Sequence, residues 1–140
     1  MQSQLRMDQA NLSRLFQMAI AGYPFETCGL LLGIRTAQSA TVAQVCQARN
    51  LNADRPYDRY EIDPEDMLAA ETAARRQDLA VIGVWHTHPD HSAEPSETDR
   101  TAAWETWSYL ILAVDCNGVT EFRSWRLNSN RQFVEETIKS

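Results

Sequence analysis

Two histidines separated by one residue, His86 and His88, are the side chains of this sequence best suited to chemistry. An aspartate, Asp99, follows eleven positions after the second histidine, and all three histidines of the chain fall between positions 86 and 91. Two imidazoles and one carboxylate supply three ligands to a divalent metal, and three protein ligands leave a fourth tetrahedral position for water. The spacing therefore predicts a catalytic zinc site rather than a closed structural one.

The segment that carries these histidines has the character of a buried strand. Residues 79–88 are almost entirely apolar, and Pro89 ends the strand because proline cannot continue a central one. Side chains alternate along a strand, so His86 and His88 should point the same way from its end. This arrangement provides a rigid support at the edge of a cleft.

A loop over residues 89–95 leads to a helix that we expect to begin at Ser96 and to end near Trp107. Asp99 would then lie one turn into the helix, where it can return toward the histidines. Ser96 allows two roles. Its hydroxyl can cap the helix in a capping box with Asp99, or it can stabilise the oxyanion that forms during hydrolysis. The upstream histidines favour the catalytic role.

A zinc hydrolase also needs a base that takes a proton from water and passes it to the leaving amine. Glu26 stands at the beginning of the apolar segment 28–34, where a carboxylate needs a partner, and zinc-bound water would be a suitable one. A solvated loop glutamate is the alternative explanation. Four other glutamates offer the same chemistry from polar segments that we expect to be exposed: Glu61, Glu65, Glu94 and Glu97.

The remaining pattern predicts an α/β or α+β layer in which about three helices flank a mixed central sheet. Two helices are expected in addition to the one after Ser96, over residues 8–21 and 64–77. Strands are expected over residues 28–34, 41–48, 79–88, 109–115 and 119–127, with a hairpin turn at Asn117-Gly118. Residues 50–59 are expected to form a loop, and residues 131–138 fit either a helix or a strand.

Composition predicts one globular domain over residues 1–140, with 44% hydrophobic and 23% charged residues. A net charge of −6 argues against a nucleic-acid or anionic-membrane surface. The cysteines Cys28, Cys46 and Cys116 include no CxxC pair, and we expect buried thiols in a reducing compartment. The polar start of the chain and the lack of a long apolar run predict a soluble cytoplasmic protein.

Other prominent side chains have simpler explanations. His91 is expected to be a solvated loop residue. Cys28 has no histidine outside the metal cluster to activate it, which favours a small buried strand residue over a nucleophile. Trp104, Trp107 and Trp125 are expected to be core or interface anchors, and an exposed one among them could grip an extended peptide.

Taken together, Glu26, His86-Thr87-His88-Pro89, Ser96 and Asp99 resemble the complete signature of the JAMM (MPN-plus) metalloproteases. The similarity extends over roughly residues 8–127. Three flanking segments resemble the family as well: Pro24–Gly33, Arg59–Pro64 and Ile82–Trp85.

The resemblance implies a cytidine-deaminase-like fold and one zinc ion per chain, held by His86, His88 and Asp99. It also implies that Glu26 acts as general base and then acid, while Ser96 steadies the tetrahedral intermediate. Members of the family cut peptide or isopeptide bonds after the C-terminal Gly-Gly of ubiquitin-like proteins, and small bacterial members are similar to peptidases of sulfur carriers. The compact chain favours a sulfur-carrier substrate, whose extended tail we expect to lie along a sheet edge.

Two alternatives come from other functional classes. MPN-type domains can be non-catalytic interaction scaffolds that bind metal incidentally, although their signature is usually eroded and here it is intact. A zinc nucleoside deaminase would share the layered fold, but it uses H-x-E with P-C-x-x-C, and this chain contains neither. Copper or nickel can also occupy nitrogen and oxygen ligands of this kind, because affinity alone does not select zinc. The sequence leaves the oligomeric state open.

Overall fold

Seven strands and three helices make up the part of the chain that the computed structural model describes, residues 3–52 and 60–140. In chain order these are β1 (Gln4–Met7), α1 (Gln9–Gly22), β2 (Cys28–Arg35), β3 (Ser39–Ala48), α2 (Pro64–Arg76), β4 (Ala80–Pro89), α3 (Glu97–Ala102), β5 (Ser108–Asp115), β6 (Gly118–Leu127) and β7 (Phe133–Lys139). The strand order is β1-β3-β2-β4-β5-β6-β7, and β7 also pairs with β1, so the mixed sheet closes into a barrel. The predicted mixed sheet with about three helices is confirmed, and the closure was not foreseen.

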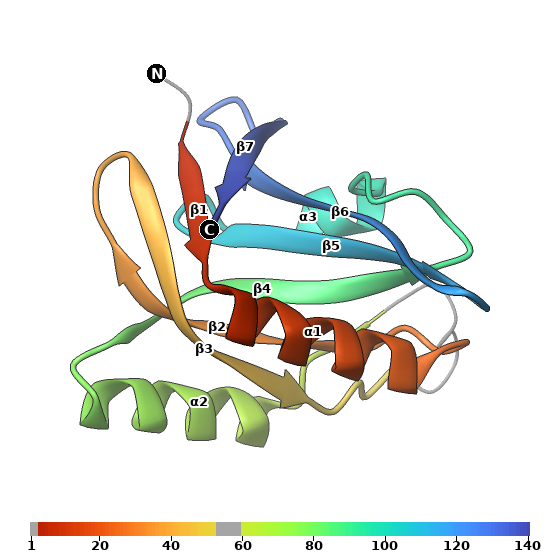
Figure 1. The fold of residues 1–140 in the computed structure, drawn as a ribbon. Helices are drawn as coiled ribbons and strands as arrows, with labels where there is room; N and C mark the ends of the chain where they lie inside the picture. The colour runs from red at the N-terminus through yellow and green to blue at the C-terminus, as the bar shows by residue number, and fades with distance from the viewer. Residues whose placement is uncertain (1–2, 53–59) are drawn as a thin grey trace.

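Helices cover two different faces of this sheet (Figure 1). The helix α1 contributes Leu15 to a core that also contains Trp85 of β4. The helix α2 contributes Ala74 to a second core that contains Val84, the neighbouring residue of the same strand. Because side chains alternate along β4, His86 projects to the same side as Val84, which is the side of α2 and α3.

Both long helices begin at an aspartate that caps them. Asp8 precedes α1, and its side chain accepts the backbone amide of Asn11 at 2.9 Å. Asp63 precedes α2 and accepts the amide of Glu65 at 2.8 Å, while Pro64 occupies the first turn, where its missing N–H is not needed.

The third helix is shorter than predicted. We expected it to reach almost to Trp107, but α3 ends before the two tryptophans that follow it. The amide of Trp104 donates to the hydroxyl of Tyr109 at 2.7 Å instead of continuing the helix. The guanidinium of Arg131 binds the carbonyl of Arg100 at 3.0 Å, so a partner distant in sequence satisfies the helix end.

Two strands depend on contacts that no local pattern reveals. The strand β1 lies in a polar segment with no predicted element, and β7 resolves the ambiguity over residues 131–138 in favour of a strand. Ser3 donates to the carboxylate of Glu136 at 2.9 Å, and Ser124 donates to the same carboxylate at 2.6 Å. The predicted loop over residues 50–59 lies partly outside the described residues.

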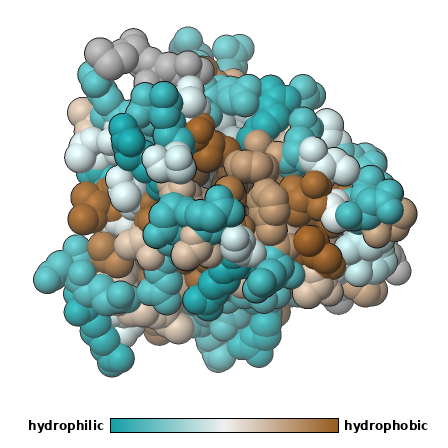
Figure 2. Space-filling model, in the orientation of Figure 1, coloured by the Kyte–Doolittle hydropathy of each residue, from teal (hydrophilic) through white to brown (hydrophobic). Residues whose placement is uncertain are grey.

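The prediction that the three thiols are buried is correct for only one of them. All three cysteines are free, but only Cys28 is buried; Cys46 is half-buried and Cys116 is exposed, because it lies at the β5–β6 turn. In the view of Figure 2, hydrophobic side chains reach the surface in several small patches bordered by hydrophilic ones. Within the described ranges, no helix is both long and apolar enough to cross a membrane.

Candidate metal centre

The three predicted metal ligands meet near the C-terminal end of β4. Nε2 of His86 lies 3.7 Å from Oδ1 of Asp99, and Nε2 of His88 lies 3.2 Å from Oδ2 of the same carboxylate. The centroids of the two imidazole rings are 5.1 Å apart. The fold therefore brings together three side chains that come from a strand and from the first turn of the following helix.

The chemistry of this cluster fits a zinc ion. Nε2 of His86 is buried and has no hydrogen-bond partner among the residues that the structure describes. A buried polar atom without a partner is unusual and requires an explanation. A divalent ion between the two Nε2 atoms and the Asp99 carboxylate would provide the missing partner, and imidazole and carboxylate are ligands that zinc takes in proteins.

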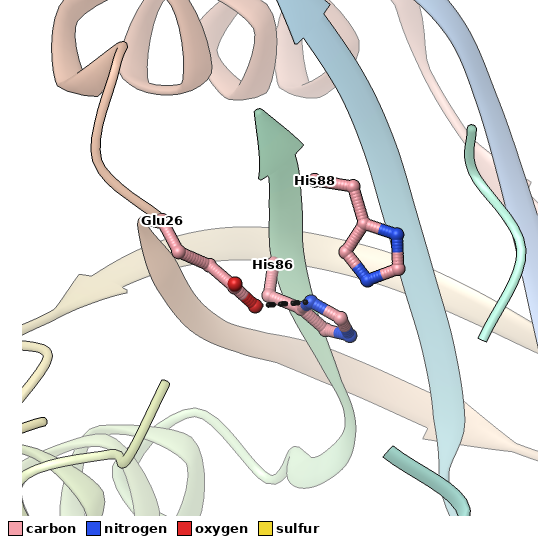
Figure 3. Close-up of side chains that lie close together, drawn as sticks. All are labelled: Glu26, His86 and His88. Carbon is pink, nitrogen blue, oxygen red and sulfur yellow. Dashed lines mark hydrogen bonds and ion pairs between the residues drawn. The ribbon is translucent and has the colours of Figure 1, made fainter. Parts of the chain in front are cut away.

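A second carboxylate, Glu26, approaches His86 from the other side of the ring. Oε1 of Glu26 lies 3.1 Å from Nδ1 of His86 (Figure 3). Ligand atoms of Glu26, His86 and His88 all lie within 4.8 Å of one another, so these residues form an alternative ligand set. We favour Asp99 as the third ligand because its carboxylate faces Nε2 of both histidines, whereas the carboxylate of Glu26 is engaged with Nδ1 of one.

The position of Glu26 follows from the pairing of β2 with β4. Just before β2, the amide of Thr27 donates to the hydroxyl of Thr87 at 2.8 Å, and the amide of Thr87 donates to the carbonyl of Thr27 at 2.9 Å. Asn50 donates to the carbonyl of Glu26 at 3.0 Å. The buried Glu26 is therefore held on both sides, and Thr87 bonds to Thr27 instead of facing the histidines.

The rival glutamates are exposed, as the sequence predicted. Three of them form ion pairs with arginines at the surface: Glu65 with Arg49, Glu94 with Arg123, and Glu97 with Arg100. Glu61 lies at the rim of the pocket beside the metal cluster. None of these four is buried as Glu26 is, so burial distinguishes Glu26 among the candidate bases.

Hydrogen bonds fix which nitrogen of His88 faces the cluster. Nδ1 lies 2.8 Å from the carbonyl oxygen of Ser92. A carbonyl oxygen only accepts, so Nδ1 carries the hydrogen and Nε2 is the nitrogen directed at Asp99. Burial alone would lower the pKa of His88, but the contacts with Asp99 and Ser92 hold that pKa above its ordinary value.

The carboxylate of Asp99 is ionised in this environment. Burial alone would raise its pKa, but the charge of His86, the bond to His88 and the amide of Ser96 together hold the pKa well below its ordinary value. An ionised carboxylate is the form that binds a metal ion.

Ser96 acts as the cap of α3, which was one of its two predicted roles. Its hydroxyl oxygen accepts the amide of Asp99 at 3.0 Å, and the amide of Ser96 donates to the Asp99 carboxylate at 2.8 Å. The first bond uses a lone pair of the hydroxyl and leaves its hydrogen available to donate. The capping box is confirmed, and it also fixes the orientation of Asp99; the catalytic role of Ser96 stays a prediction.

An apolar pocket opens next to Asp99. Its walls include Val84, Tyr109, Trp104 and Trp107, and the side chain of Trp104 is 66% exposed. Tyr60 also lines it and stacks on the ring of His86, with centroids 4.3 Å apart and an interplanar angle of 24°. Sequence reasoning missed this stacking, although the segment around Tyr60 was among those that resemble the JAMM family.

Comparison with known proteins agrees with this geometry. The family described as prokaryotic homologs of the JAB domain matches residues 8–128. The chain belongs to this family. A desampylase of Haloferax volcanii is 34% identical to this JAB-domain protein over 105 residues, which cover 74% of the chain and 73% of the relative. A probable TtuB-protein conjugate cleaving protease of Thermus thermophilus is 33% identical over 100 residues, covering 71% and 62%.

A solved structure gives the same result for the fold. The solution structure of protein DSY2949 from Desulfitobacterium hafniense superposes with a TM-score of 0.83 and 26% identity, covering 96% of this chain and 90% of the other. The resemblance to the JAMM family is thereby confirmed, and this JAB-domain protein is a hydrolase of the JAMM type.

Proposed function

We propose that this JAB-domain protein is a zinc-dependent protease that hydrolyses the peptide or isopeptide bond after the C-terminal Gly-Gly of a ubiquitin-like or sulfur-carrier protein. The observation that carries the proposal is the convergence of His86, His88 and Asp99 beside an apolar pocket, where Nε2 of His86 has no hydrogen-bond partner among the described residues. The names of its relatives, a desampylase and a protease of TtuB conjugates, support the substrate class.

In this mechanism His86, His88 and Asp99 would hold the metal. Zinc at this position supplies a Lewis acid that polarises the scissile carbonyl and makes water a nucleophile at neutral pH. Glu26 takes the proton of the attacking water at Oε2, because Oε1 is engaged with His86, and returns the proton to the leaving amine. The hydroxyl of Ser96 donates to the substrate carbonyl oxygen as negative charge develops, an interaction that can contribute about 3 kcal/mol.

The substrate tail has a second candidate path besides the sheet edge that the sequence predicted. We expected it to lie along a sheet edge, and among the described strands β1 pairs with β3 only over Ser39–Val42 and β7 with β6 only over Ser124–Leu127, so the rest of β3 and of β6 is paired on one side only. The apolar pocket beside Asp99 is the other candidate position for an extended tail. A Gly-Gly end carries no side chains, so it can pass close to the stacked rings of Tyr60 and His86 while bulkier preceding residues contact Trp104.

The same proposal includes the setting of the protein. Residues 1–140 would form a single domain of the cytidine-deaminase-like type that works in the cytoplasm. The three free cysteines support a reducing compartment, because exposed thiols such as Cys116 are usually paired in secreted proteins.

The test uses small carrier proteins that end in Gly-Gly and are extended by a short peptide or joined to a lysine side chain. The zinc-loaded protein should release fragments whose masses correspond to cleavage directly after the second glycine. The matched substrate replaces Gly-Gly by Ala-Ala and should be cleaved much more slowly; equal cleavage would refute the tail specificity. Zinc binding without cleavage of any carrier would favour the non-catalytic scaffold instead.

A further inference from the structure

We propose that Glu121 and Trp125 of β6 are positioning residues for the metal centre, which they reach through the loop between β4 and α3. The inference rests on the metal site proposed above and adds residues that no part of the JAMM-like signature contains. It starts from Ala93 in that loop, which is fully buried although Ser92 and Glu94 on either side are exposed.

Side chains of β6 hold both backbone polar groups of Ala93. The amide of Ala93 donates to Oε1 of Glu121 at 2.7 Å, and Nε1 of Trp125 donates to the carbonyl of Ala93 at 3.0 Å. The methyl group of Ala93 packs in a small cluster with Ile111 and Ala113 of β5. The loop is therefore attached to the sheet at a single residue by two hydrogen bonds and a buried methyl group.

This attachment continues directly to a metal ligand. The amide of Ala93 and the carbonyl of Ser92 belong to one peptide group, which is planar, so fixing the N–H also fixes the direction of the C=O. That carbonyl accepts Nδ1–H of His88 at 2.8 Å. Glu121, the peptide group and His88 thus form a continuous chain of hydrogen bonds in which each group orients the next.

The charge of Glu121 adds to this effect. A carboxylate that accepts an amide hydrogen makes a shorter and stronger bond than a neutral group, and bonded groups in series polarise one another. The carbonyl of Ser92 consequently becomes a better acceptor for His88. The result is an imidazole held with Nδ1 protonated and with Nε2 aimed at Asp99, the form that binds a metal ion.

The experiment compares zinc affinity and the tautomer of His88 in full-length variants. Glu121→Ala removes the acceptor, whereas Glu121→Gln keeps an oxygen at the same position. We expect Glu121→Ala to weaken zinc binding about tenfold in a chelator competition. Nitrogen-15 NMR of the metal-free protein at alkaline pH should show His88 losing its uniform Nδ1–H form. Glu121→Gln keeps the acceptor but loses the charge, so it should lie between the wild type and Glu121→Ala in both measurements.

Two further variants separate this role from general stability. Trp125→Phe keeps the apolar ring and removes only the Nε1–H donor, so it should move both readouts in the direction of Glu121→Ala. Glu71→Ala removes an exposed negative charge on α2 and should change neither. Unchanged affinity and unchanged tautomer in both Glu121→Ala and Trp125→Phe would overturn the inference, as would an equal loss in Glu71→Ala.

The outcomes also distinguish this inference from the proposed function. A wild-type protein that binds no zinc would refute the metal site, and the tautomer of His88 would still test the hydrogen-bond chain. A wild-type protein that binds zinc, together with variants that bind it equally well, would refute only the positioning role. If Trp125→Phe fails to fold, the comparison of Glu121→Ala with Glu121→Gln decides the question.

Discussion

Replacing Glu26 by glutamine and by alanine should separate two functions that this side chain combines. Glu26 is only 3% exposed, and its Oε1 lies 3.1 Å from Nδ1 of His86. Glutamine keeps an oxygen that can accept from Nδ1, but its amide cannot take a proton. Alanine removes both the acceptor and the base. Any difference between the two variants therefore measures the orientation of His86, and their shared defect measures proton transfer.

The expected magnitudes differ between the two readouts. Loss of a general base lowers the rate by about 10²–10⁴-fold, so both variants should lose turnover of a Gly-Gly carrier to that extent. Loss of a hydrogen-bond partner of a metal-binding histidine weakens metal affinity by about 10–100-fold, which corresponds to about 1.4–2.7 kcal/mol. Zinc should therefore bind to Glu26→Gln almost as in the wild type and clearly more weakly to Glu26→Ala.

Chelator competition and fragment mass analysis on the same samples supply the two measurements. Turnover retained by Glu26→Gln would show that the base lies elsewhere. Equal zinc affinity in both variants and the wild type would refute the orienting contact. Asp99→Asn is the decisive control for the ligand set. If Glu26 rather than Asp99 were the third ligand, both Glu26 variants would lose zinc and Asp99→Asn would retain it.

Three further predictions concern the metal, the sheet and the thiols. Zinc at 100 times its dissociation constant should stabilise the fold by about 2.7 kcal/mol. At about 3 °C per kcal/mol for a chain of this size, removing zinc with a chelator should lower Tm by about 8 °C. An unchanged Tm would contradict the proposed metal site. Gly29→Ala should lower the free energy of unfolding, measured by urea denaturation, by about 2 kcal/mol or more. The reason is that the added Cβ would lie 1.9 Å from the carbonyl oxygen of Cys46 and 2.4 Å from Nε1 of Trp85. Unaltered stability would refute this close packing. Burial, and to a smaller extent the nearby Glu26, raise the pKa of Cys28 to about 12, so its thiol stays neutral at pH 8. Iodoacetamide should therefore label the exposed Cys116 but not Cys28 in the native protein, which mass spectrometry of the labelled protein would show.

Much of the fold could be predicted because its signals are local. The residue pattern of segments 8–21 and 64–77 indicates α1 and α2 without knowledge of any distant residue. The apolar runs of β2, β4 and β5 likewise mark buried strands, and the turn before Gly118 marks a hairpin. The convergence of His86 and His88 follows from strand alternation alone.

Closure of the barrel could not be predicted in the same way. The strand β1 has only four residues and forms because β3 and β7 offer it parallel partners from distant parts of the chain. The length of α3 depends on Arg131, which binds the carbonyl of Arg100 across the fold. Sequence patterns report the intrinsic preference of a segment, whereas these elements are set by partners that the segment meets only after folding.

The sequence by itself determined the kind of chemistry, since two imidazoles and a carboxylate at this spacing have few uses other than binding a metal ion. Only the tertiary structure decided how each donor is directed. It placed Glu26 against Nδ1 of His86 and Asp99 against Nε2, and it held the Ser92 carbonyl on His88 by way of Glu121. The physical reason is that residue types fix which bonds are available, while the direction of a hydrogen bond depends on backbone positions that packing between distant strands sets.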